Sequence, residues 1–408
     1  EVFEAGHGRE ALEVLEEIGK TELMLVDWNM PEMNGYDFVC AVRSDDYCDA
    51  SFLMMVTTET EMTQVVKALE AGVNEYVMKP FTKEVILEKL NLPLCHKLTE
   101  QLASFPQRPI LVLTGGDPMK RDDVFDIIWA GVDTGLTVTM TPSATPLVTP
   151  QAIEQLKAAG LSRLAVSLDG VDAATHDGIR GVEGSFQQTL QIIREARAVR
   201  LPVQINTMVS KRNVEQVDAM AEFIADLDII LWSVFFLVPV GRGVAEQRIA
   251  PEQYEEVFER LWHHAETKPY SIKTTEAHHY RRFVLQRGGN PQRGTGELAE
   301  HADRVQRAPL GVSDGKGCMF VSHIGQIFPS GFLPIEAGRF PRDSIVEVYQ
   351  DSPIFKQLRD PDGFGGKCGR CEFRQICGGS RARAYAVMGD YLAAEPDCVY
   401  QPAEQDDI

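Results

Sequence analysis

The segment ILVLTGGDP, at residues 110–118, decides the fold of most of this chain. An apolar run typical of a buried strand is followed directly by two glycines and an acidic residue. Comparable strands recur with helical patterns between them, at Ile110–Thr114, Leu136–Met140, Arg163–Leu168, Val203–Met208 and Ile229–Leu237. Repeated strand–helix units of this length predict a parallel α/β sheet, either a barrel or a doubly wound sheet.

Polar residues gather where these predicted strands end. Two adjacent glycines let a ligand approach the backbone closely, although a lone glycine pair is more often an ordinary turn. Because ligands bind at the carboxyl ends of parallel strands, we expect a ligand site along this edge. Its candidate residues are Gly115, Gly116, Asp117, Pro118, Ser167, Asp169, Arg180 and Asn206.

The first ninety residues have their own alternation of strands and helices. The predicted strands are Val2–Glu4, Leu23–Asp27, Phe52–Thr57 and Glu75–Met78, and the predicted helices are Arg9–Ile18, Tyr36–Arg43, Met62–Ala71 and Lys83–Leu90. Asp27, Thr57 and Lys79 fall at the carboxyl ends of three of these strands. The pattern predicts a second parallel sheet with its own ligand edge.

Four cysteines lie close together near the C-terminus, three of them in GFGGKCGRCEFRQICGGSRARAY at residues 363–385. Cys368, Cys371, Cys377 and Cys398 have the spacing C-x2-C-x5-C-x20-C. The chain has eight cysteines in 408 residues and opens without a signal-peptide pattern, so we expect a cytoplasmic protein with reduced thiols. The cluster therefore predicts a metal site, and the spacing alone leaves zinc and iron–sulfur open.

Composition excludes several classes of protein. The net charge of −20 disfavours nucleic acid as a partner, and no apolar run is long enough to span a membrane. The length favours two or three domains. His263–His264 and His278–His279 lie in a charged stretch, Pro251–Arg287, that we predict to be helical. These histidines could bind a metal, but we expect them to be solvated or to line a substrate site. A glycine-rich surface loop or a substrate-facing lid is expected at Gly288–Arg304.

Residues 1–92 resemble a response-regulator receiver domain. The resemblance rests on LMLVDWNMPEMNGYDF, MMVTTETE and AGVNEYVMKPFT, and it implies a flavodoxin-like fold. It also implies Asp27 as phosphoacceptor, Thr57 and Lys79 as contacts to the phosphoryl group, Mg²⁺ as cofactor and a histidine kinase as partner. Receivers begin with a strand that ends in an acidic pair for Mg²⁺. No such strand precedes Val2, so we expect a truncated receiver. Asp27 alone is not expected to accept a phosphoryl group, because the acidic residues that hold Mg²⁺ are missing.

Residues 97–402 resemble radical S-adenosylmethionine (AdoMet) enzymes with a C-terminal SPASM-type domain. TGGDP, SLDG, HDGIRG, QINTMV and C-x2-C-x5-C occur in the order of that family. The resemblance implies an auxiliary 4Fe–4S cluster at the four cysteines, with Cys318 either free or a further ligand. It also implies a reductant such as a flavodoxin or ferredoxin, and a peptide or small-molecule substrate. The implied AdoMet contacts are Gly115, Gly116, Asp117, Pro118, Ser167, Arg180 and Asn206.

This sequence departs from that family in two places. The C-x3-C-x2-C motif for the catalytic cluster is absent, and with it the first strand of the partial (β/α)6 barrel. Ser330 and Arg381 stand where two-cluster SPASM domains have cysteines. We therefore expect two truncated segments joined near residues 91–98. The expected division is a receiver at 1–92, a junction at 93–108, a barrel at 109–245, a helical and loop region at 246–310 and a small loop-rich iron–sulfur domain at 311–408.

Three functions follow from these resemblances. The first is a radical AdoMet enzyme that matures a peptide or a tetrapyrrole-like substrate. The second is a phosphorelay protein in which the receiver regulates a fused iron–sulfur domain. The third is an inactive chimera that keeps binding sites for the cluster and for AdoMet. We favour the first function for the family and the third, the inactive chimera, for this chain.

Overall fold

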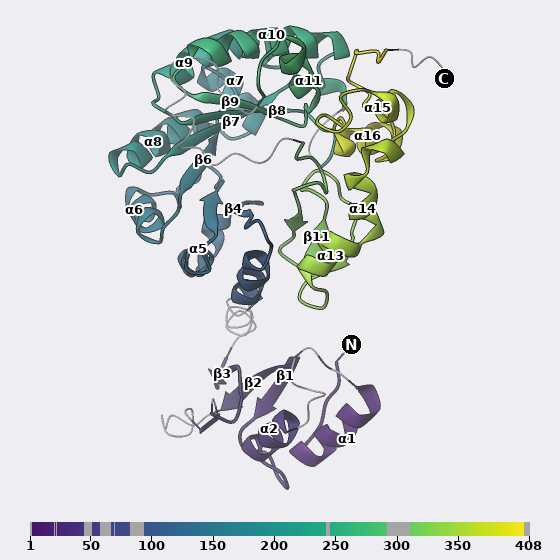
Figure 1. The fold of residues 1–408 in the computed structure, drawn as a ribbon. Helices are drawn as coiled ribbons and strands as arrows, with labels where there is room; N and C mark the ends of the chain where they lie inside the picture. The colour runs from purple at the N-terminus through teal and green to yellow at the C-terminus, as the bar shows by residue number, and fades with distance from the viewer. Residues whose placement is uncertain are drawn as a thin grey trace. The chain divides into compact units, whose positions relative to one another are not determined.

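The computed structural model describes residues 2–19, 21, 23–44, 51–57, 67–68, 70–81, 94–241, 245–291 and 311–403. The chain forms two compact units, Glu1–Cys95 and His96–Ile408 (Figure 1). Among the described residues, no helix has the length and apolar character needed to cross a lipid bilayer.

The first unit is built on three parallel strands. β1 (Leu23–Asp27), β2 (Phe52–Thr57) and β3 (Glu75–Met78) pair in that order. The helices α1 (Gly8–Ile18) and α2 (Gly35–Arg43) belong to the same unit. In β2, which lies between the other two strands, five of six residues are buried. A near-continuous apolar run is what a parallel strand covered on both faces requires.

One predicted strand of this unit is not formed, and two predicted helices cannot be compared with the structure. Val2–Glu4 is not a strand, because no described strand pairs with it and Val2 and Phe3 are exposed. A strand needs a neighbour that satisfies its backbone N–H and C=O groups. The helices predicted at 62–71 and 83–90 lie largely outside the described residues.

The second unit contains a six-stranded parallel sheet whose order follows the chain. Its strands are β4 (Ile110–Leu113), β5 (Thr137–Met140), β6 (Arg163–Ser167), β7 (Val203–Val209), β8 (Leu231–Phe236) and β9 (Ser271–Thr275). All five neighbouring pairs are parallel, and the sheet curves as a half-barrel (Figure 1). The carboxyl ends of all six strands therefore share one edge.

Helices accompany this sheet along the described part of the chain, in addition to the helical residues 96–103. They are α5 (Val124–Asp133), α6 (Pro150–Ala158), α7 (Ala173–Arg180), α8 (Ser185–Ala198), α9 (Val217–Ala225), α10 (Pro251–Thr267) and α11 (His279–Gln286). Side chains from helices and strands form one core in which Ile193, Trp232 and Phe258 are fully buried. Local signals set the helix ends: Thr149 accepts a hydrogen bond from the Ala152 N–H, and Gly181 ends α7 in the left-handed conformation.

The prediction of one helical stretch at Pro251–Arg287 is wrong. This stretch contains α10, then β9, then α11, so the sheet has one strand more than the five predicted. The sequence of β9, SIKTT at Ser271–Thr275, is short and has few apolar residues, so its pattern does not indicate a strand. It is a strand because it pairs with β8. His264, His278 and His279 are buried rather than solvated, whereas His263 is exposed. The loop predicted at 288–304 lies mostly outside the described residues.

The C-terminal part of the second unit is loop-rich, as predicted. A small antiparallel sheet comprises β10 (Phe320–Val321), β11 (Gln326–Phe328) and β12 (Gly338–Arg339). Four short helices follow, α13 (Ile345–Asp351), α14 (Pro353–Arg359), α15 (Gly366–Arg370) and α16 (Arg381–Met388). Ser380 caps α16 by accepting a hydrogen bond from the Arg383 N–H. Four 3-10 helices occur in the second unit, at Pro118–Lys120, Val214–Gln216, Ala245–Gln247 and Pro361–Gly363.

Candidate functional site

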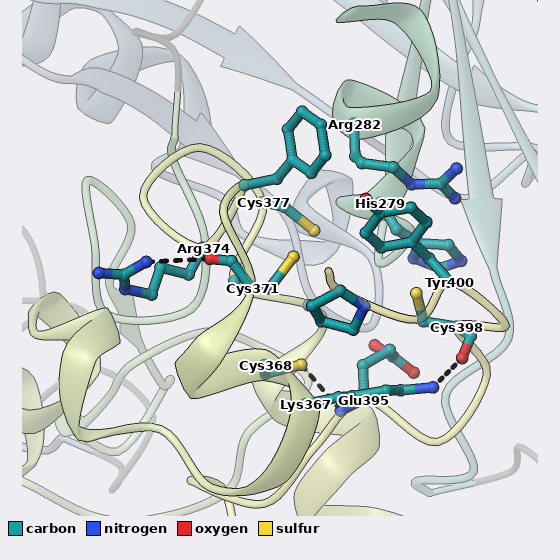
Figure 2. A pocket seen from close by; sticks show the side chains of 14 residues that line it. His279, Arg282, Lys367, Cys368, Cys371, Arg374, Cys377, Glu395, Cys398 and Tyr400 are labelled. Carbon is teal, nitrogen blue, oxygen red and sulfur yellow. Dashed lines mark hydrogen bonds between the residues drawn. The ribbon is translucent and has the colours of Figure 1, made fainter. Parts of the chain in front are cut away.

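The four C-terminal cysteines line one pocket. Cys368 lies in α15, Cys371 caps the end of that helix, and Cys377 and Cys398 reach the pocket from the loops on either side of α16 (Figure 2). The tight loop around Cys368 depends on Gly369, because a Cβ there would lie 1.9 Å from the carbonyl oxygen of Phe364. The prediction that these thiols share a site therefore has a geometric basis, although nothing in the fold identifies the metal.

The pocket is a cavity that is partly open to solvent. About 400 Å³ of space inside it, the open part included, is free of protein atoms. Among the described residues, no three Cys, His, Asp or Glu side chains converge closely enough to hold a single ion. Zinc would need its thiolates about 2.3 Å from one point, whereas a 4Fe–4S cluster would be held by four thiolates on separate irons.

Burial keeps the thiols of Cys377 and Cys398 protonated when no metal is bound. Burial raises the pKa of Cys377 to about 12 and that of Cys398 to about 11. A bound metal supplies the positive charge that favours thiolates in such a place. Basic side chains add to it: Arg282, Lys367 and Arg374 also line the pocket (Figure 2). The pocket is thus suited to a group that carries negative charge on its sulfurs.

Two donors face the Cys368 sulfur, one from the backbone and one from a side chain. The Glu395 N–H donates to Cys368 Sγ at 3.2 Å, and Arg381 Nη2 lies 3.8 Å from the same sulfur. The other three thiols, of Cys371, Cys377 and Cys398, each have a backbone hydrogen bond, with Phe373, Gly379 and Tyr400 respectively. Lys367 Nζ donates to the Cys398 carbonyl oxygen, and Arg374 Nη1 donates to the Cys371 carbonyl oxygen at 3.1 Å, so the cysteine loops are fixed on several sides.

Arg383 is fully buried and joins the loop-rich C-terminal part of the second unit to the half-barrel. Arg383 lies 3.2 Å from both carboxylate oxygens of Glu395 and 3.2 Å from Asp397 Oδ2. Its Nη2 donates to the Glu276 carbonyl oxygen at 2.5 Å, just beyond β9. The Ser380 N–H donates to Glu395 at 2.6 Å. The network ties the end of the sheet to the segment that carries Cys377 and Cys398.

Changing Arg383 to Met is expected to destabilise the second unit by about 3–5 kcal/mol, because two carboxylates would stay buried without their cation. Urea unfolding of the full chain measures this free energy. Arg342→Met is the control, since that arginine is 64% exposed and its pair with Asp343 contributes about 0–1 kcal/mol. Equal unfolding free energies for the two variants would show that the network carries no stability.

Glu276 is an unusual residue at the carboxyl edge of the sheet. It follows β9 with a φ of 59°, is buried, and accepts a hydrogen bond from Ser380 Oγ. Burial, and next the charge of Asp314, raise the pKa of Glu276 to about 8. A carboxyl group held in its neutral form beside a ligand edge is a candidate for a functional role.

The unfolding free energy is expected to fall as pH rises from about 4.5 to about 8. Glu276 releases its proton near its ordinary pKa in the unfolded chain and near 8 in the folded one, so the folded state binds more protons in this window. Glu276→Gln removes this contribution, and its unfolding free energy should depend less on pH. Denaturant titrations at pH 5, 6.5 and 8 test this; parallel profiles for the two proteins would contradict it.

Cys318 is not among the residues that line the cysteine pocket. Burial, and next the charges of Asp314 and Glu276, raise the pKa of its thiol to about 12. Ser330 Oγ donates to Asp314 Oδ1, and the Ala382 N–H donates to Asp314 Oδ2 at 3.0 Å. The Asp314 carboxylate, whose charge acts on Cys318, is thus already hydrogen-bonded within the protein.

Four of the predicted AdoMet contacts, Gly115 to Pro118, lie in the loop after β4. Gly115 follows β4 with a φ of 125°, which favours glycine, and a Cβ on Gly115 or Gly116 would meet no atom within 4 Å. Asp117 Oδ2 accepts from Thr145 Oγ1 at 2.9 Å, and the Gly116 carbonyl accepts from Ser143 Oγ at 2.8 Å. The loop after β4 is thus fixed against the loop after β5, with open space above its glycines.

Of the other three predicted contacts, Ser167 lies on β6, Asn206 on β7 and Arg180 at the end of α7. Ser167 and Asn206 are partners in the register of these strands. Arg180, at the end of α7, lies 2.6 Å from Oδ2 of the buried Asp169, and Asp169 Oδ1 accepts from the Met208 N–H at 2.7 Å. Asp169 thereby holds Arg180 beside the same edge.

The three receiver residues also meet at one edge of their sheet. Lys79 Nζ lies 2.5 Å from Asp27 Oδ2, and Thr57 is buried at the end of the strand between them. The Asn29 N–H donates to Asp27 Oδ1 at 3.2 Å, and the peptide bond between Lys79 and Pro80 is cis. The arrangement predicted for Asp27 and Lys79 is present.

Comparison with known proteins identifies both units. The Response regulator receiver domain family matches residues 1–91, and the Radical SAM superfamily matches residues 88–224. The AdoMet-dependent heme synthase of Methanosarcina barkeri is 41% identical over 298 residues, which cover 73% of this chain and 84% of that protein. The chain belongs to the radical SAM superfamily.

Two further matches agree with this division. Chemotaxis protein CheY1 of Helicobacter pylori is 49% identical over 94 residues, covering 23% of this chain and 76% of that protein. The structure of Streptococcus suis SuiB bound to S-adenosylmethionine matches with a TM-score of 0.55 at 14% identity, covering 76% of this chain and 70% of that one. The last match shows a shared fold. Both recognised families, and the α/β architecture that they imply, are confirmed.

Sequence reasoning missed several residues around the cysteine pocket. Arg383 and Glu395 were not predicted to take part, yet each contacts or supports this site. Glu395 had a signal, since it stands three residues before Cys398 in EPDC. Arg383 had none, because its partners come from distant segments. His279 was predicted to be solvated or to line a substrate site, and the structure places it in the lining of the cysteine pocket.

Proposed function

We propose that the second unit is an iron–sulfur protein that binds AdoMet and acts on an iron tetrapyrrole. The observation that carries this proposal is the pocket formed by Cys368, Cys371, Cys377 and Cys398, in a chain 41% identical to a heme synthase. A 4Fe–4S cluster bound there supplies one-electron transfer. The four cysteines would be its ligands, and Arg282, Lys367 and Arg374 would balance its charge.

The cosubstrate role is proposed for the strand ends. Gly115 and Gly116 offer exposed backbone, and the Asp117 carboxylate is oriented by Thr145. Arg180, fixed by Asp169, would accept a carboxylate, while Ser167 and Asn206 would contact hydroxyl groups. Pro118 is buried and begins the short helix that holds Asp117 in place. These groups match the ammonium, carboxylate and ribose groups of AdoMet.

Asp117→Asn is expected to weaken AdoMet binding about tenfold. The change keeps the shape of the side chain but removes the charge, and a hydrogen bond to a charged group contributes about 1.5–3 kcal/mol. Equilibrium dialysis of labelled AdoMet against the reconstituted full chain measures the dissociation constant. Asp122→Asn, at an exposed neighbouring position, is the matched control. Equal binding by both variants would exclude Asp117 from the cosubstrate site.

The tetrapyrrole part of the proposal has a direct test. Iron coproporphyrin III is titrated into the reconstituted protein while its Soret band is recorded. We expect a saturable change with one porphyrin per chain, and no competition by an unrelated acidic peptide. A spectrum that stays that of free porphyrin would overturn this substrate class and leave the cluster assignment standing.

The printed chain is proposed to lack reductive cleavage of AdoMet. Its cysteines are at 40, 48, 95, 318, 368, 371, 377 and 398, so no C-x3-C-x2-C motif exists to hold a cluster with an open iron. We therefore propose that the chain is related to active radical AdoMet enzymes and keeps its sites for the auxiliary cluster and for AdoMet, but does not cleave AdoMet.

A second candidate function is phosphorelay signalling, with a histidine kinase as partner of the receiver. It is favoured by the approach of Lys79 Nζ to Asp27 Oδ2 at 2.5 Å, which places a cation beside the expected phosphoacceptor. Thr57, buried at the neighbouring strand end, would contact the phosphoryl oxygens. Mg²⁺-dependent phosphorylation at Asp27 by acetyl phosphate, abolished by Asp27→Asn, would support this role.

A further inference from the structure

A buried histidine with no hydrogen-bond partner faces the cysteine pocket. His279 is the first residue of α11 and is 1% exposed. Its ring lines the same pocket as the four cysteines (Figure 2). Neither Nδ1 nor Nε2 has a hydrogen-bond partner among the residues that the structure describes. Such an unsatisfied buried ring is rare and calls for a ligand that completes it.

The rest of the ring is held by apolar contacts. Tyr254 lies 5.2 Å from it between ring centroids, and Phe258 lies 4.9 Å away on α10. These contacts fix the ring without using its nitrogens. His279 also lines the pocket, so a group bound there would lie beside the ring.

The ring is neutral at physiological pH. Burial lowers the pKa of His279 to about 3, with the cations Arg383, Arg282 and Lys367 adding to this and Glu395 opposing it. A neutral imidazole has one N–H donor and one acceptor nitrogen. Thiolate and sulfide sulfurs are acceptors, so a cluster in the pocket would provide what the donor lacks.

We propose that His279 donates its ring N–H to a sulfur of the cluster held by Cys368, Cys371, Cys377 and Cys398. This inference rests on the proposed function, because it needs the cluster. It makes His279 a positioning residue that tunes the cluster. A donor at a cluster sulfur stabilises the more negative, reduced form and raises its reduction potential. The effect is large where water is excluded.

Two variants separate this role from packing. His279→Phe keeps an aromatic ring against Tyr254 and Phe258 but removes the donor. His279→Gln keeps an N–H donor on a side chain of similar length. The matched control is His263→Phe, an exposed histidine on α10. All are made in the full chain and reconstituted anaerobically.

The measurements are iron content and the midpoint potential of the cluster, followed by electron paramagnetic resonance in a redox titration. We expect wild-type iron in all variants. The equilibrium constant for one-electron reduction should fall about tenfold in His279→Phe, a shift of about 59 mV to more negative potential. His279→Gln should fall between that variant and wild type, and His263→Phe should match wild type.

Three results would overturn the inference. Full iron with an unchanged potential in both His279 variants would exclude the hydrogen bond. Loss of iron in both variants would show that His279 is itself a ligand or supports the fold. A wild-type chain that takes up no iron would instead refute the proposed function, and this role with it.

Discussion

Anaerobically reconstituted wild-type protein is expected to bind about four irons per chain, and Cys371→Ala to lose most of them. Cys371 lines the pocket together with the other three cysteines, and each would ligate one iron of a 4Fe–4S cluster. Removing one thiolate leaves an iron open in a pocket where burial already disfavours charge. The measurement is iron and sulfide content, with the absorbance of the cluster near 400 nm followed in air.

The control for this prediction is Cys40→Ala, which changes an exposed cysteine of the first unit. Its iron content should equal that of wild type. Cys318→Ala separates the two alternatives for that residue, since unchanged iron would leave Cys318 a free thiol. One zinc and no iron in wild-type protein purified under anaerobic conditions would replace the cluster with a mononuclear site.

The site could be predicted from sequence wherever its residues are set by short-range pattern. The spacing of Cys368, Cys371 and Cys377 brings three thiols together through one short helix and the hydrogen-bonded turns that follow Cys371, so that part needs no tertiary information. Strand ends behave similarly, because an apolar run that stops at Asp27 or at Gly115 indicates both the strand and its edge.

What the sequence did not predict depends on contacts between distant segments. Glu276 and Arg383 are 107 positions apart, and the hydrogen bond between them exists only because β9 joins the sheet beside β8. The strand itself was missed because SIKTT has little apolar character, and its pairing partner determines its state. His279 seemed to belong to a charged helix face until β9 ended that helix and placed α11 against the pocket.

In the first unit the error is the reverse one, because a strand was predicted where none forms. Val2–Glu4 has the residue types of a strand, but among the described residues no neighbour pairs with it. Strand propensity is a preference for a partly buried, paired surface, so it does not act where that surface is missing. Leu23–Asp27 has a similar composition and forms β1 because Phe52–Thr57 lies beside it in register.

The full chain, reconstituted and reduced with dithionite, is expected to form no 5′-deoxyadenosine from AdoMet above background. Reductive cleavage needs an electron from a cluster with one open iron that chelates the amino and carboxylate groups of AdoMet. Cys95 is the single cysteine between residues 49 and 317, so the half-barrel offers no set of three thiolates. The C-terminal cluster would have all four of its irons ligated.

The same reaction mixture without protein sets the background, and the Cys371→Ala variant separates a role of the C-terminal cluster from other sources. Opening one iron in that variant is not expected to create a competent site, because the cysteine pocket is formed by α15 and the loops around α16, whereas the proposed AdoMet contacts lie on the loop after β4, on β6 and β7 and at the end of α7. We therefore expect background amounts from Cys371→Ala as well. Formation of 5′-deoxyadenosine by wild type that is lost in Asp117→Asn would prove that a usable site exists without the motif, and the proposal of an inactive barrel would then be wrong.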